Sequence, residues 1–134
     1  MARIVKSIKS GGDTTGLGET TPTDQLEGRY SVEVATLTDG ATITPDFGAN
    51  QNFTVTLGGN RTLANPSNLV AGQSGAVFIT QDATGSRTLT YGAYWKFAGG
   101  TTPTLTTTAN AVDMLVYVVK SSTEVYASLS NNMS

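Results

Sequence analysis

The chain has 134 residues, a net charge of −2 and 13% charged residues, and it contains neither cysteine nor histidine. The lack of cysteine excludes disulfides and thiolate metal sites, and the lack of histidine removes the commonest general base and metal ligand. Nucleic-acid binding is disfavoured because contacts to phosphates need many lysines and arginines. The longest apolar run, residues 114–119, is too short to span a membrane, and no secretory signal is visible. We therefore expect a structural or binding protein without metal or cofactor.

The first 35 residues are poor in apolar side chains and rich in glycine, threonine and proline. Such a segment cannot bury enough apolar surface to fix its own backbone, so we predict an extended arm over residues 1–35 that is ordered against a partner. The spacing of Asp24 and Glu27 matches a helix N-cap with an acid three positions on, which predicts one helical turn over residues 24–29. A frayed terminus or an expression artefact is the alternative interpretation of this segment.

A small cationic and apolar segment opens the arm. Its basic residues have no acidic neighbour, whereas the next charged residues, Asp13, Glu19 and Asp24, are all acidic. A segment of this kind can add as a strand to a partner or enter an acidic groove. We expect it to anchor the protein on a larger assembly, with a merely solubilising terminus as the alternative. The candidate anchoring residues are Arg3, Ile4, Val5, Lys6, Ile8 and Lys9.

From about Ser31 onward, alternation with a period of two indicates short strands separated by turn signals such as Asp39-Gly40. Threonine, about one residue in six, favours strands because it is β-branched. We predict an all-β fold over residues 36–134, an antiparallel β-sandwich of jelly-roll type, while a barrel and other strand orders stay open. The expected strands cover residues 31–36, 41–44, 53–57, 61–64, 76–81, 87–91, 94–97, 112–119 and 124–129.

The core of this body is thin for about 100 residues without disulfides or metal, which favours association of subunits. The run from Met114 to Val119 is apolar on both faces of a strand, so one face suits the core and the other suits a subunit contact. A central strand in a single closed body is an equally weighted alternative. We assign the subunit contact to Leu115, Tyr117 and Val119.

Two further groups of residues are candidates for sites. Aromatic residues cluster between Tyr91 and Phe97, and core packing is the favoured interpretation, with Tyr94 and Trp95 as candidate glycan contacts. In the later half of the chain the carboxylates are Asp82, Asp113 and Glu124. Glycoside hydrolysis needs two carboxylates across a cleft, and their scattered placement makes an enzyme improbable.

The body resembles a β-rich module of structural proteins of tailed bacteriophages, which occurs in tail fibres and other virion appendages. The resemblance covers roughly residues 37–130 and implies a non-enzymatic virion protein, with trimers usual in that class. The matching segments, in order, are residues 52–66, 71–75, 79–89, 96–105 and 109–113.

The length of the arm decides which virion role we expect. Thirty extended residues reach about 100 Å at most, so we expect an arm without a long shaft. We therefore expect a capsid decoration or head-fibre protein, a homotrimer on the surface of the phage particle that is anchored to the shell through its arm. The alternative is a tail-fibre or tail-tip knob that binds a host-surface glycan. A small depolymerase acting through its carboxylates is a third, disfavoured hypothesis.

Overall fold

The structure is a computed structural model that describes residues 31–134. The expectations for the helical turn at residues 24–29 and for the anchoring residues between Arg3 and Lys9 lie outside the described residues. Most of the expected arm lies outside them as well. At its end, residues 34–36 form the first strand of the body.

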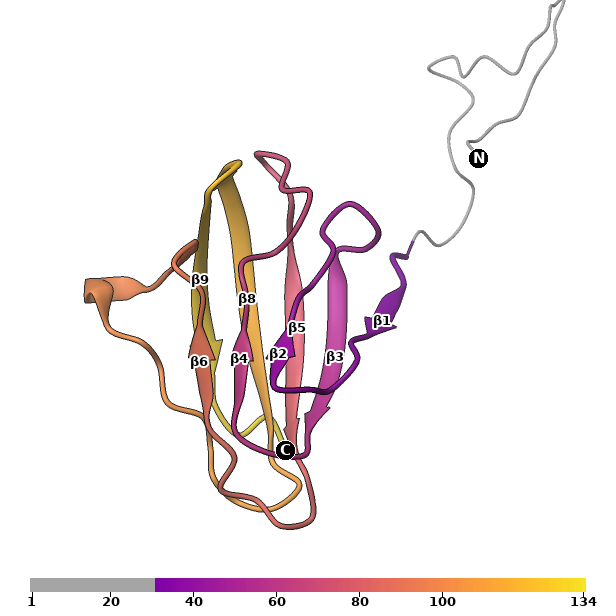
Figure 1. Ribbon diagram of the computed structural model, residues 1–134, viewed down its shortest axis with the longest axis vertical. Coiled ribbons are helices and arrows are strands. Elements are labelled where there is room, and N and C mark those ends of the chain that lie inside the picture. Colours follow the sequence, from indigo (N-terminus) through magenta and orange to yellow (C-terminus); the bar gives the residue numbers. More distant parts are fainter. Residues whose placement is uncertain (1–30) are drawn as a thin grey trace, which may run out of the picture. The chain divides into compact units, whose positions relative to one another are not determined.

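The described chain is all-β, as expected, and strands form in all nine of the expected places (Figure 1). Apart from one short 3-10 turn, η1 (Ala98–Gly100), it contains no helix, and thus none that is long and apolar enough to cross a membrane. The strands are β1 (Val34–Thr36), β2 (Thr42–Ile43), β3 (Asn52–Leu57), β4 (Arg61–Leu63), β5 (Ser74–Gln81), β6 (Leu89–Tyr91), β7 (Trp95–Lys96), β8 (Val112–Ser121) and β9 (Glu124–Ser130).

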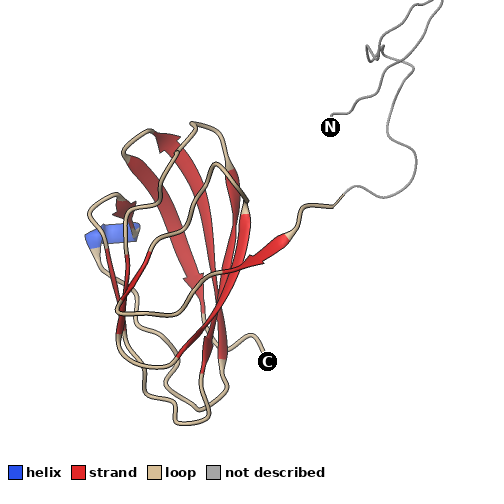
Figure 2. Cartoon of the chain, turned by 45° about the vertical axis from the view of Figure 1, so that its right-hand side comes forward, coloured by secondary structure: helices blue, strands red, loops and turns tan. Residues whose placement is uncertain are grey.

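The strands form two sheets that pack as two layers, shown from a second direction in Figure 2. The six-stranded sheet has the order β1-β3-β5-β8-β9-β7, and the three-stranded sheet has the order β2-β4-β6. From β1 to β6 the chain passes from one sheet to the other at every step, so each strand lies parallel to the strand two places earlier. Parallel neighbours need a crossover connection, and here the opposite sheet supplies it in place of a helix.

This topology corrects the expected antiparallel, jelly-roll-like arrangement. Five of the seven strand pairs are parallel, and only β5–β8 and β8–β9 are antiparallel. A jelly roll is built from antiparallel strands. Here β1 to β6 form a parallel coil, and β8 is the strand that pairs antiparallel, with β5 on one side and β9 on the other. The physical reason is that alternation with a period of two determines which face of a strand is buried. It does not determine which strand pairs with it or whether that pair is parallel or antiparallel.

The core lies between the two sheets and is filled by alternate residues of each strand. In the six-stranded sheet one inward row runs across five strands through neighbouring pairs. Ile43 and Leu63, which are 1% exposed, cover this row from the three-stranded sheet. The row consists of Ala35, Phe53, Val77, Leu115 and Leu129.

An aromatic cluster occupies the middle of this core. The Phe47 ring stacks on the Tyr117 ring with centroids 4.5 Å apart and meets the Trp95 ring edge-on at 6.2 Å. Trp95 is 5% exposed, and its indole Nε1 donates a hydrogen bond to the Ala64 carbonyl at 2.9 Å. The single tryptophan is therefore a core residue whose one polar group is satisfied.

A close approach beside β5 depends on a glycine. A Cβ at Gly75 would lie 2.1 Å from the Gln51 carbonyl oxygen and 2.9 Å from the Tyr117 hydroxyl oxygen, so no larger residue fits there without a shift of the backbone. The Tyr117 hydroxyl donates a hydrogen bond to the same Gln51 carbonyl. Gly75 and Tyr117 thus fix the segment before β3 against β5 and β8.

The hydroxyl groups of Tyr117 and Tyr91 are both buried and provide a matched test of this core. Replacing Tyr117 with Phe removes the donor to Gln51, and we expect the free energy of unfolding to fall by about 1 kcal/mol. Within the described residues the buried Tyr91 hydroxyl has no hydrogen-bond partner, so Tyr91→Phe should leave the stability unchanged or raise it. Urea unfolding followed by tryptophan fluorescence measures both. Equal losses in the two variants would contradict this account of the core.

Candidate functional site

A groove with a volume of about 460 Å³ opens where β1 and β2 form the edges of the two sheets. It lies within the first turn of the coil, between the strands and the loop that leads to β3. The lining residues come from 35–40 and 42–44, together with Asp46, Ala49, Asn50 and Phe53.

The wall of the groove is mixed, with hydroxyl, carboxylate and amide groups beside the aliphatic side chains of Ala35, Leu37 and Ala49. Thr36, Thr38 and Thr42 are exposed there, whereas Ile43 and Phe53 are 1% and 2% exposed. Because the Phe53 ring is buried, it offers no face on which a ligand ring could stack. The groove therefore offers hydrogen-bonding groups and a modest aliphatic surface, but no aromatic platform.

Asp46, which lines the groove, is held as an anion by its hydrogen bonds. Its Oδ1 accepts hydrogen bonds from the Asn68 side-chain amide at 2.8 Å and from the Gly48 backbone N–H at 2.9 Å. These donors, Asn68 first, hold the pKa of Asp46 below its usual value. A general acid at neutral pH needs the opposite shift, so Asp46 stays ionised and fixes the loop.

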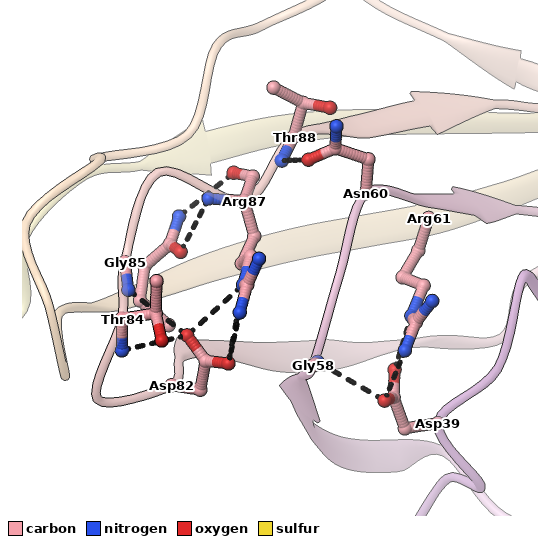
Figure 3. A network of polar contacts seen from close by, with 10 residues as sticks. Asp39, Gly58, Asn60, Arg61, Asp82, Thr84, Gly85, Arg87 and Thr88 are labelled. Carbon is pink, nitrogen blue, oxygen red and sulfur yellow. Dashed lines mark hydrogen bonds and ion pairs between the residues drawn. The ribbon is translucent and has the colours of Figure 1, made fainter.

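Two Asp–Arg pairs hold the turns at the ends of the neighbouring strands (Figure 3). Arg61 donates through Nε and Nη2 to the two Asp39 carboxylate oxygens, both at 2.8 Å, and the Gly58 N–H donates to Asp39 at 3.1 Å. Arg87 donates in the same forked way to Asp82, with its shortest contact at 2.8 Å. Bidentate pairs of this kind are the strongest form of side-chain ion pair and fix both position and orientation.

The hydrogen bonds of Asp39 and Asp82 lower their pKa values. The Arg61 guanidinium holds the pKa of Asp39 below its usual value, and Arg87 lowers the pKa of Asp82 to about 2. The Thr84 and Gly85 N–H groups add to the effect at Asp82, through bonds of 3.1 and 3.0 Å. Both carboxylates are thus stabilised as anions and act as structural acceptors.

The other two candidate carboxylates, Asp113 and Glu124, have structural partners too. Asp113 is 2% exposed and accepts hydrogen bonds from the Thr106 and Asn132 backbone N–H groups, both at 2.7 Å. Glu124 accepts a bond from the Ser121 hydroxyl at 3.2 Å and lies 4.0 Å from the Lys120 ammonium. Within residues 31–134 no group of three or more acidic side chains is placed to hold a metal ion.

The buried amide of Gln81 was not among the candidates from the sequence, yet it organises this end of the body. Its Nε2 donates to the carbonyls of Arg87 at 2.9 Å and Thr106 at 2.8 Å, and its Oε1 accepts from the Arg87 N–H at 2.9 Å. Alternation does place Gln81 on the inward face with Val77 and Ile79. Gln81 could have been identified from the sequence as a polar residue at an inward position, because a buried amide requires hydrogen-bond partners.

The two candidate glycan contacts have different surroundings. Trp95 is buried in the core and is not accessible to a glycan, which corrects its assignment as a contact. Tyr94 is partly exposed, and its backbone N–H donates to the Asn65 side chain at 2.8 Å. Neither residue lines the groove.

The candidate subunit-contact residues lie on the inward face of β8. Leu115, Tyr117 and Val119 are 0%, 2% and 1% exposed, so their assignment to a subunit contact is corrected to the core. The outward residues of the same strand are Met114, Val116 and Val118. The run is apolar on both faces, as the sequence indicated, but the sequence alone did not show which face is which.

Comparison of the sequence with models of protein families gave a match within the two-sheet body. A family model described as "Putative phage tail fibre C-terminal domain" matches residues 41–121, which is more than half of the chain. The matched span contains β2 to β8 and therefore strands of both sheets. A search of curated proteins and a search of solved structures each gave no match.

The Asp–Arg pairs predict a specific loss of stability in acid. The pKa of Asp82 is about 2 in the folded chain against an ordinary value of 3.8, so its ionised form stabilises the fold above about pH 4. This contribution should be lost as the pH falls from 4 toward 2. We expect the melting temperature of Asp82→Asn to depend less on pH in this window than that of the parent chain.

Circular dichroism melts between pH 6 and pH 2 measure this dependence. Arg87→Gln removes the cation in place of the carboxylate and should flatten the same part of the profile. Profiles parallel to that of the parent chain in both variants would contradict the structural role of the pair.

Proposed function

The chain belongs to the family of phage tail fibre C-terminal domains, and we propose on this basis that it forms the non-enzymatic knob of a tail fibre. The family match over residues 41–121 is the observation that carries the proposal, because it spans strands of both sheets and about half of the residues that line the groove. Membership of the family makes the chain a structural protein of a phage virion. Its position within the virion is part of the proposal.

A tail location is favoured over the capsid decoration that the sequence analysis expected. The matching family is described by its place in tail fibres, whereas the argument for the shell rested on the length of an arm that lies outside the described residues. In a tail fibre, the arm with its basic segment at residues 3–9 would attach the knob to another virion protein. We therefore propose that the arm still anchors the protein, and that its binding partner is a protein of the tail and not of the shell.

The non-enzymatic part of the proposal is supported by the state of the carboxylates. Asp39, Asp46 and Asp82 have lowered pKa values, and Asp113 is buried with backbone donors on both of its oxygens. A glycosidase needs a carboxyl group that stays protonated near neutral pH and a second carboxylate across a cleft. The bonded carboxylates of this chain instead support a domain that binds without turnover.

The ligand that we propose for the groove is a carbohydrate of the host-cell surface. A sugar presents many hydroxyl groups and no obligatory charge, which suits a wall of threonine hydroxyls with asparagine and aspartate acceptors. The groove offers no exposed aromatic ring, so affinity at one site would be low. This role extends the knob proposal, and its failure would leave the virion location untouched.

Localisation on intact particles tests the virion role. Particles that carry an epitope-tagged copy of this protein should bind gold-labelled antibody at the tail, and particles with a tagged copy lacking residues 2–12 should show no label. The deletion should leave the circular dichroism spectrum of the purified protein unchanged, because it removes no residue of the two sheets. Label spread over the head would refute the tail location, and full labelling of the truncated form would refute the anchor.

Binding to a glycan array tests the groove. Thr36→Val and Thr38→Val together remove two hydroxyls from the wall while keeping β-branched side chains, and we expect binding to fall by about tenfold. The matched control is Thr56→Val, an exposed position on β3 outside the groove, which should bind as the parent chain does. An array without signal for the parent chain, or an equal loss in the control, would refute the carbohydrate role.

A further inference from the structure

The basic side chains of the two-sheet body have two kinds of surroundings. Residues 31–134 contain two arginines and two lysines. Both arginines are held in the Asp–Arg pairs that fix the turns. Both lysines are exposed and lie on the outward face of the six-stranded sheet, beside one exposed aromatic ring. We call this group the lysine–tyrosine cluster; its members are Lys96, Lys120 and Tyr126.

Strand register brings the members of the lysine–tyrosine cluster together. Tyr126 lies on β9 and pairs directly with Val118 of β8 on one side and with Lys96 of β7 on the other. Directly paired residues of neighbouring strands project from the same face of a sheet. Lys120 follows two places after Val118 on β8, and its ammonium lies 5.6 Å above the Tyr126 ring centroid. A lysine therefore approaches the ring from each neighbouring strand.

The two ammonium groups remain open to a ligand. The Lys120 side chain is 65% exposed and lies 4.0 Å from Glu124, and an exposed ion pair at such a distance contributes little. Within residues 31–134 the ammonium of Lys96 takes part in no ion pair. The body as a whole has more acidic than basic side chains, so this cluster is opposite in sign to the rest of it.

Protection of a sheet edge explains only one of the two lysines. A lysine on an edge strand can prevent pairing with a foreign sheet, and β7, which carries Lys96, is an edge strand. Lys120 lies on β8, which is an interior strand between β5 and β9. The position of Lys120 therefore needs another explanation, and the ring beside it indicates a binding site.

The chemistry of the cluster selects a ligand that has both an apolar face and a negative charge. Tyr126 and Val118 are 46% and 53% exposed and form a floor on which the C–H face of a sugar ring can pack. The ammonium groups donate charge-assisted hydrogen bonds to a carboxylate. The flexible stem of Lys120 lets its ammonium move off the ring while it stays within reach of the ligand. Nucleic acid is disfavoured, because it needs many more cations.

We propose that the lysine–tyrosine cluster binds an acidic sugar, a uronate unit of a cell-surface polysaccharide. The uronate carboxylate pairs with the ammonium groups of Lys96 and Lys120, and the sugar ring packs on Tyr126. The inference rests on the proposed carbohydrate role for the class of ligand, and it adds a charged site to the groove. No residue of the cluster lines the groove, so either site can fail alone.

Calorimetric titration of the full chain with a galacturonate tetramer and with its methyl ester tests the proposal. The ester keeps the sugar rings and loses the charge, so we expect it to bind at least about tenfold more weakly. Lys96→Gln and Lys120→Gln should each weaken binding of the tetramer about threefold, and Tyr126→Ser about tenfold. Glu124→Gln removes the acid beside Lys120 and should tighten binding about twofold.

A matched control separates the site from the net charge of the chain. Thr56→Glu lowers the net charge by one, as each lysine variant does, at an exposed position on β3, the third strand away from β9. It should bind the tetramer as the parent chain does, and circular dichroism checks that every variant is folded. The Thr36→Val and Thr38→Val double variant of the groove should also keep the affinity of the parent chain.

Each outcome decides for or against the cluster. Weaker binding in both lysine variants, with tighter binding in Glu124→Gln, supports it. A parent chain that does not bind the tetramer, or that binds the ester equally well, refutes it, and neutral sugars bound in the groove would then still support the carbohydrate role. An equal loss in Thr56→Glu refutes it as well, as does a loss that occurs only in the groove variant.

Discussion

Contact between the two sheets is the interaction on which the rest of the structure depends. The strands of the smaller sheet are two or three residues long, and such short strands have too few hydrogen bonds and too little buried surface to persist alone. They are held because Ile43, Leu63 and Leu89 enter the core formed by the larger sheet. From β1 to β6 the chain crosses between the layers at every step, because each short strand of the smaller sheet is followed by a return to the larger sheet that continues the core.

Polar side chains inside the body serve the same end. Gln81 and Asp113 are each 2% exposed and satisfy backbone groups of the loops that close the coil. The Asp39–Arg61 and Asp82–Arg87 pairs fix the turns at that end. Because these acidic groups are committed to the fold, the carbohydrate binding proposed for the groove would rely on hydroxyls, amides and backbone groups. The chemistry expected of the groove is thus a consequence of how the turns are held.

Strand positions could be predicted from the sequence because alternation is a local property of five or six residues. Pairing could not, since Asp39-Gly40 and Gly58-Gly59-Asn60 look like hairpin turns yet carry the chain to the other sheet. The same limit explains the misplacement of Leu115 and its inward neighbours, because a strand that is apolar on both faces gives no sign of which face is inside. The groove could not be predicted from the sequence, because its lining residues come together only when the first turn of the coil stacks in parallel on the second.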